Sequence, residues 1–141
     1  MATTPIVTYA LDEVNTPVLT GALEQHAAHR EQQTHEPLFA PTVEARIELL
    51  EEVARADQLR RTVKDAQSAG YIAVPLDPVT FQMLSAALSS YQADQEHAAE
   101  EATRKHDDPE DGDPARQIAA TADHLHLLAI EATQFTPHPP N

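Results

Sequence analysis

The residues that mark helix starts and ends constrain the fold of this chain more than any other sequence feature. At three of the predicted helix starts a proline follows a residue of helix-capping type: Thr16-Pro17, Asp77-Pro78 and Asp113-Pro114. Such pairs mark helix starts, because proline fits the first helical position. Thr42 is a fourth cap, and Gly70 is a C-terminal stop. With only three glycines in the chain, the sequence predicts an all-α fold with helices at about 17–34, 43–69, 78–105 and 114–135.

The segments between these helices are short. "PIVTYAL" (5–11) and "YIAVPL" (71–76) are rich in β-forming residues and are expected to be short extended segments; the sequence leaves open whether they pair. The expected organisation is an N-terminal extended segment (1–16), a helical domain (17–135) forming a small bundle of about four helices, and a tail (136–141). That proline-rich tail, "TPHPPN", is expected to be disordered.

Charge and composition exclude several function classes. The net charge is −14, the wrong sign for displacing counterions from DNA or RNA phosphates or for binding an anionic membrane. The chain has no cysteine, which excludes disulfides, thiolate zinc sites and cysteine nucleophiles. The N-terminus lacks the basic and apolar regions of a signal peptide, and no apolar run is long enough to span a membrane. We therefore expect a cytoplasmic protein without direct nucleic-acid or membrane contacts.

Apolar stripes at helical spacing predict the buried faces. In the first, third and fourth helices the predicted apolar stripes are Val18, Leu19, Ala22 and Leu23, then Phe81, Leu84, Leu88, Tyr91, Gln95, Ala98 and Ala102, then Ile118, Ala122, Leu125, Ala129, Ala132 and Phe135.

The second helix carries two stripes. Val43, Ile47, Leu50 and Ala54 share one face, and Leu59, Val63 and Ala66 lie roughly opposite. In the fourth helix, Leu127 and Ile130 likewise fall on the far side of the main stripe. Aromatic residues make up only 4% of the chain, so the core is short of large side chains. Chains with such a core often bury additional apolar surface against a second copy. The sequence predicts a homodimer, with Leu59, Val63, Leu127 and Ile130 as interface candidates. A kink near Asp57 that keeps both stripes internal is the alternative.

Histidines and carboxylates raise the question of a metal site. In "EQHAAHREQQTHE" (24–36), His26 and His29 are three residues apart and share one helix face. A zinc site needs a third or fourth ligand, and none lies at a workable spacing. The acidic "DDPEDGD" segment (107–113) fails as a calcium loop, because Pro109 and Ile118 occupy positions where the EF-hand pattern requires oxygen ligands. The sequence predicts no metal and no cofactor.

No catalytic motif stands out, so the sequence predicts a non-enzymatic acidic helical protein. We expect it to self-associate and to bind another protein as a regulator, adaptor or inhibitor. One alternative is an acidic mimic of nucleic acid, since segment 94–113 holds nine carboxylates beside Arg104 and Lys105. A second is a metalloenzyme that combines Glu51, Glu52, His26 or His97 across helices.

Overall fold

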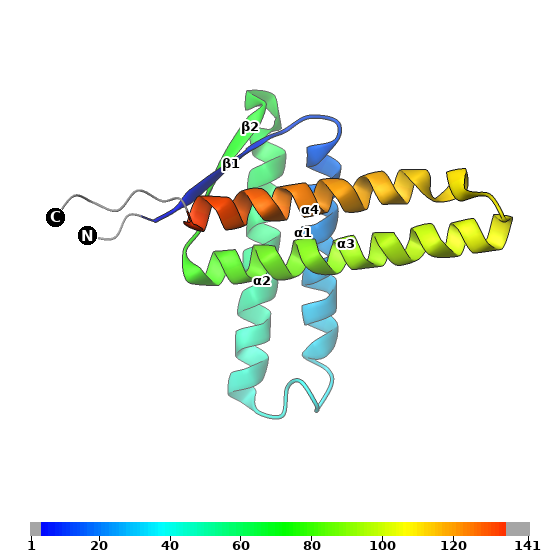
Figure 1. Cartoon of the computed structure of the whole chain (residues 1–141). Coiled ribbons are helices and arrows are strands. Elements are labelled where there is room, and N and C mark those ends of the chain that lie inside the picture. Colours follow the sequence, from blue (N-terminus) through cyan, green and yellow to red (C-terminus); the bar gives the residue numbers. More distant parts are fainter. Residues whose placement is uncertain (1–3, 135–141) are drawn as a thin grey trace.

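Two helical hairpins and a small β-sheet make up the protein. The computed structural model describes residues 4–134, and α1 with α2 forms one antiparallel hairpin that crosses the α3–α4 hairpin (Figure 1). The elements in chain order are β1 (Ile6–Ala10), α1 (Asn15–Gln33), α2 (Val43–Ala66), the 3₁₀ turn η1 (Gln67–Ala69), β2 (Tyr71–Pro75), α3 (Pro78–His106), the 3₁₀ turn η2 (Pro109–Gly112) and α4 (Asp113–Gln134). The predicted all-α fold with four helices is confirmed. Phe135 and the tail 136–141, predicted to be disordered, lie outside the described residues.

Predicted capping residues set two of the helix starts and one helix end. The Thr42 hydroxyl accepts a hydrogen bond from the Ala45 amide at 3.1 Å, and the Asp77 carboxylate accepts one from the Thr80 amide at 2.7 Å. Gly70 has a φ of 82°, a left-handed conformation that glycine adopts without the Cβ clash of other residues. Thr42 and Asp77 therefore begin α2 and α3 as predicted, whereas α2 ends at Ala66 and Gly70 ends the 3₁₀ turn η1 that follows it.

The start of α1 differs from the prediction. Thr16 lies inside the helix, which begins at Asn15. The Asp12 carboxylate holds this start instead, because it accepts hydrogen bonds from the Val14 amide at 2.9 Å and the Asn15 amide at 2.7 Å. These two bonds lower the pKa of Asp12. A charged carboxylate is a stronger acceptor than a threonine hydroxyl, so the cap moves upstream.

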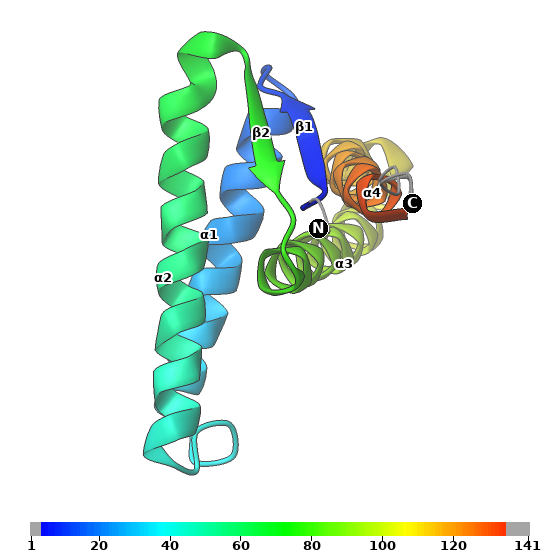
Figure 2. The same ribbon diagram turned by 90° about the vertical axis from the view of Figure 1, so that its left-hand side faces the viewer.

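The two extended segments pair as an antiparallel sheet. Val7 lies opposite Val74, and Tyr9 lies opposite Ile72. These four side chains face the core, whereas their neighbours along each strand face solvent. The pairing that the sequence left open therefore exists, and it joins the start of one hairpin to the start of the other (Figure 2).

The core lies where α1, α3, α4 and the inner face of the sheet meet. The Tyr9 hydroxyl donates a buried hydrogen bond to the Leu125 carbonyl at 2.7 Å, which ties β1 to α4. At the crossing of α1 and α3, a Cβ on Gly21 would lie 2.8 Å from the Tyr91 hydroxyl, so glycine permits the close approach. The predicted faces of α1, α4 and the first half of α3 are confirmed by the buried side chains of Val18, Leu19, Ala22, Leu23, Leu84, Leu88, Ala122, Leu125 and Ala129, with Phe81, Tyr91, Ile118 and Ala132 packed against them. In the second half of α3 the prediction is wrong at Ala98, which is exposed, because its neighbour Ala99 is buried instead.

In α2 the buried and the exposed apolar stripes are the opposite of those predicted. Val63, expected on a surface for a second copy, is 1% exposed within the single chain, and Leu59 packs against the same core. The second half of α2 lies beside the sheet, and its apolar side is buried in the core. The first half extends past the crossing with the other hairpin (Figure 2), where no element covers its outer side. Leu59 and Val63 are therefore intramolecular contacts.

Candidate functional site

The first half of α2 exposes a row of apolar side chains. Val43 is 68% exposed, Ile47 49% and Leu50 47%, and Ala54 is also exposed. The four residues are spaced so that they share one side of the helix; we call this row the α2 stripe. Soluble proteins rarely leave large side chains contiguous and exposed unless they bind something.

The connector before α2 adds two more apolar side chains to the same hairpin tip. Leu38 is 84% exposed and Phe39 46%. Figure 1 shows this tip, in cyan, projecting well beyond the α3–α4 hairpin. Neither side chain reaches the core, so the tip gains little from them in an isolated chain. The tip thus combines apolar surface with an unobstructed approach.

The opposite side of α2 explains why the stripe is uncovered. That side packs on α1 through small and medium residues, including Ala56, which is fully buried, and Val53, which packs against the core. Because α1 already covers this side, the α2 stripe has no neighbour left within its own hairpin. The helix therefore has two apolar sides, of which the fold uses one.

Behind the stripe, a charged cluster joins α1 to α2. The Nε2 atom of His26 lies 3.1 Å from one oxygen of Glu52, and the Nε atom of Arg30 lies 2.8 Å from the other. Arg30 and Glu52 form an ion pair, whereas the His26 contact is an ion pair only when the imidazole is protonated. Burial lowers the pKa of His26, although the Glu52 carboxylate pulls that pKa upward. The cluster sets how α1 and α2 align at the tip.

The metal-ligand candidates meet only in part. His26 and Glu52 come together, but Arg30 places a positive charge on the same carboxylate, where a metal ion would be repelled. Glu51 and His29 are exposed, and His97 instead pairs with Glu101 at 3.2 Å on α3. Among the described residues, no three His, Cys, Asp or Glu side chains gather at metal-binding distance.

The interface candidates on α4 occupy intermediate surroundings. Leu127 is 47% exposed and Ile130 is half-buried, so part of this second apolar side remains accessible. Among the described residues of α4, no large apolar side chain besides Leu127 is strongly exposed. The apolar surface of α4 is therefore smaller than the α2 stripe. An interface at Leu127 and Ile130 stays a prediction.

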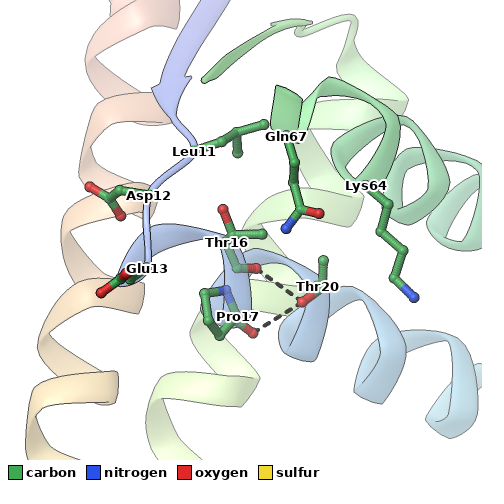
Figure 3. Close-up of a pocket in the computed structure, with 8 residues that line it drawn as sticks. All are labelled: Leu11, Asp12, Glu13, Thr16, Pro17, Thr20, Lys64 and Gln67. Carbon is green, nitrogen blue, oxygen red and sulfur yellow. Dashed lines mark hydrogen bonds between the residues drawn. The ribbon is translucent and has the colours of Figure 1, made fainter. Parts of the chain in front are cut away.

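A polar depression lies at the other end of the α1–α2 hairpin. It has a volume of about 590 Å³ and is bounded by the β1–α1 loop and the end of α2. Figure 3 shows the Lys64 side chain directed away from Asp12 and Glu13, and the Thr20 hydroxyl donating to the carbonyl oxygens of Thr16 and Pro17. The carboxylate of Asp12 is already engaged as the α1 cap. Asp12 and Thr20 therefore serve the local fold, and Lys64 points away from both acidic side chains (Figure 3).

Sequence reasoning missed the α2 stripe as a surface because it assigned the large residues of α2 to the core. Two signals pointed the other way. Asp57 interrupts the stripe where it would continue, and the connector before α2, which is bounded by prolines, itself carries the apolar Leu38 and Phe39.

None of the helices within residues 4–134 has the length and hydrophobicity needed to cross a membrane. Compared with known proteins, the chain shows no significant match to any family model, curated protein or solved structure.

Proposed function

We propose that this chain is a non-enzymatic acidic protein of the cytoplasm that self-associates and acts by binding another protein. The observation that supports the proposal is the α2 stripe, together with Leu38 and Phe39 at the same tip. Keeping these side chains in water forgoes roughly 25 cal/mol for each Å² that a partner could bury. Roles as a regulator, adaptor or inhibitor need only such a recognition surface.

The disposition of polar groups fits a binding role. Arg30 and Glu52 neutralise each other behind the stripe, and His26 contacts the same carboxylate; a half-buried polar cluster of this kind favours one alignment of the two helices. A surface fixed in this way binds without ordering costs, which favours affinity. The polar cluster thus supports the shape of the tip.

Affinity capture tests the proposal. Tagged wild type and an Ile47→Glu, Leu50→Glu variant are incubated with lysate of the source cell, with Val79→Glu, at a residue as exposed as Leu50, as the matched control. We expect wild type and the control to retain the same partner at 0.15 M and 0.5 M salt, because burial of apolar surface responds little to ionic strength. The stripe variant should lose that partner. Equal capture by all three proteins would refute binding through the tip.

An acidic mimic of nucleic acid is the second candidate. All nine carboxylates of segment 94–113 are exposed; Asp94 lies at the crossing with α1, where Gln25 donates to it, and the others follow towards the tip of the α3–α4 hairpin. A mimic would release its partner as salt rises, since it depends on unscreened charge. Replacing Asp107, Asp108, Glu110 and Asp111 by Asn and Gln should abolish capture if this candidate is right, and should leave capture unchanged if the tip of the other hairpin binds.

A further inference from the structure

We propose that a second copy of this chain covers the α2 stripe, with the two α2 helices side by side and parallel. This inference rests on the proposed self-association and gives it a surface and an orientation. A symmetric dimer is the commonest closed assembly, and here its two-fold axis runs along the paired helices. The contact lies between the two tips, on the side of α2 that faces away from α1 and from the rest of the molecule (Figure 2).

The available area fits a small dimer. The stripe, Leu38 and Phe39 include five large side chains that are 46% to 84% exposed and offer on the order of 500 Å². Pairing removes such an area from both copies, so it buries on the order of 1,000 Å², the size at which specific interfaces begin. The contact therefore needs most of the tip, and a partner that matches it along its full length.

The spacing within the stripe is that of a two-stranded coiled coil. Val43 and Leu50 take the d positions of a heptad, and Ile47 and Ala54 the a positions. A β-branched residue at a with leucine at d favours two strands. Asp57 and Arg61 occupy the next d and a positions, so the seam ends there. A seam this short suffices because α2 is already folded against α1, and pairing does not have to nucleate a helix.

Flanking charges select the parallel orientation. In the same heptad Arg46 takes position g and Glu51 position e, and a parallel pair sets g of one helix against the following e of the other. Each Arg46 then faces Glu51 of the second copy, twice by symmetry. Within residues 4–134 neither side chain forms an ion pair in its own chain. An antiparallel pair would instead bring Glu44 of one copy towards Glu51 of the other, which is repulsive.

Sedimentation equilibrium tests the surface. Wild type at tens of micromolar should show twice the chain mass of 15.4 kDa. The Ile47→Glu, Leu50→Glu variant should keep its helical circular dichroism and dissociate, with a dissociation constant raised by about 30-fold or more. Val79→Glu, at a residue as exposed as Leu50 but on α3, should dimerise as wild type does. A stripe variant that stays dimeric overturns this inference alone, whereas a monomeric wild type overturns the proposed self-association as well.

A charge exchange covers the outcome in which the stripe variant fails to fold. Arg46→Glu and Glu51→Arg each place like charges across the seam and should weaken the dimer by about 3-fold to 10-fold. The double variant restores opposite charges and should restore wild-type affinity. If the double variant is as weak as the singles, the two residues do not face each other and the parallel arrangement is wrong.

Single cysteines test the orientation directly, since the chain has none of its own. In the parallel pair each d position faces its own counterpart, so Val43→Cys should form an intermolecular disulfide with itself on mild oxidation. The a positions of a parallel pair also face their own counterparts, so Ala54→Cys should do the same at the other end of the seam. In an antiparallel pair neither variant would cross-link alone, but a mixture of the two would. That second pattern overturns the parallel orientation.

Discussion

The tips of the two hairpins have opposite surface chemistry. The α1–α2 tip exposes Leu38, Phe39 and the α2 stripe, whereas the α3–α4 tip exposes carboxylates and few large apolar groups. Both hairpins consist of two helices and a short connector, and both extend beyond the shared core (Figure 1). The fold therefore does not decide what each tip does; the side chains on its outer surface do.

The two connectors also differ in how tightly they are held. At the α3–α4 tip, Arg116 donates to the Pro109 carbonyl at 2.7 Å and to the Thr103 hydroxyl at 2.8 Å. Gly112 is buried between them, with its missing Cβ directed at the Ala99 carbonyl. A solvated acidic tip thus keeps its shape through its own hydrogen bonds. The apolar tip is closed by fewer long-range bonds, and contact with a partner would cover it.

The same substitution in the core and on the α2 stripe gives the largest contrast. Leu125 is fully buried and Leu50 is 47% exposed. Leu125→Ala should lower the free energy of unfolding by about 2–5 kcal/mol because it leaves a cavity. Leu50→Ala should lower it by less than about 1 kcal/mol. Urea denaturation at low protein concentration, where association contributes least, checks this; equal losses would mean that the stripe is buried within one chain.

Gly112→Ala should loosen the α3–α4 tip. Its Cβ would lie 2.6 Å from the Ala99 carbonyl oxygen, so the connector must shift, at a cost of about 1–3 kcal/mol. Amide hydrogen exchange should rise over residues 99–116 and stay unchanged at the other tip. Gly70→Ala is the control, because nothing lies within 4 Å of its Cβ and its φ strain acts at the end of α2. Unchanged exchange over 99–116 would contradict the close packing.

Tyr9→Phe should lower the free energy of unfolding by about 0.5–1.5 kcal/mol, since it removes the buried bond to the Leu125 carbonyl. Burial raises the pKa of Tyr9. A raised pKa contributes stability that is complete below the ordinary tyrosine pKa of about 10 and is lost as pH rises above it. Unfolding measured from pH 8 to 11 should therefore show a smaller alkaline loss in the variant. Tyr71→Phe, at a residue 57% exposed, should behave as wild type.

Local signals predicted the fold well, because caps act within a few residues. Thr42, Asp77 and Gly70 end or begin helices by bonding or turning the adjacent backbone. The α1 start was misplaced by two residues because two capping types, Asp12 and Thr16, compete there. Strand pairing could not be predicted, since it depends on how the hairpins cross.

The candidate site was only partly predictable. The side of α2 that packs on α1 mixes Leu49 and Val53 with the small Ala45 and Ala56, so the row of Val43, Ile47 and Leu50 looked more like core. Size alone does not decide burial when a helix has two apolar sides. The meeting of His26 with Glu52 was within reach, however. The two residues are equally distant from the connector at Phe39, and an antiparallel hairpin sets such residues side by side.

The smallest effect is expected at the acidic tip, from the combined replacement of Asp107, Asp108, Glu110 and Asp111 by Asn and Gln. Asp108 caps η2 through the Glu110 amide at 3.0 Å, and asparagine keeps the accepting oxygen. Asp107 has a φ of 52°, a conformation that asparagine also tolerates. Losing charges that already lie in solvent changes little, so the free energy of unfolding should stay within about 0.5 kcal/mol of wild type. Chemical denaturation at 0.05 M and 0.5 M salt checks this, because relief of carboxylate repulsion would show as a gain at low salt only. A loss of more than about 1 kcal/mol at both salt concentrations would mean that the acidic tip, like the apolar one, depends on specific contacts of its outer side chains.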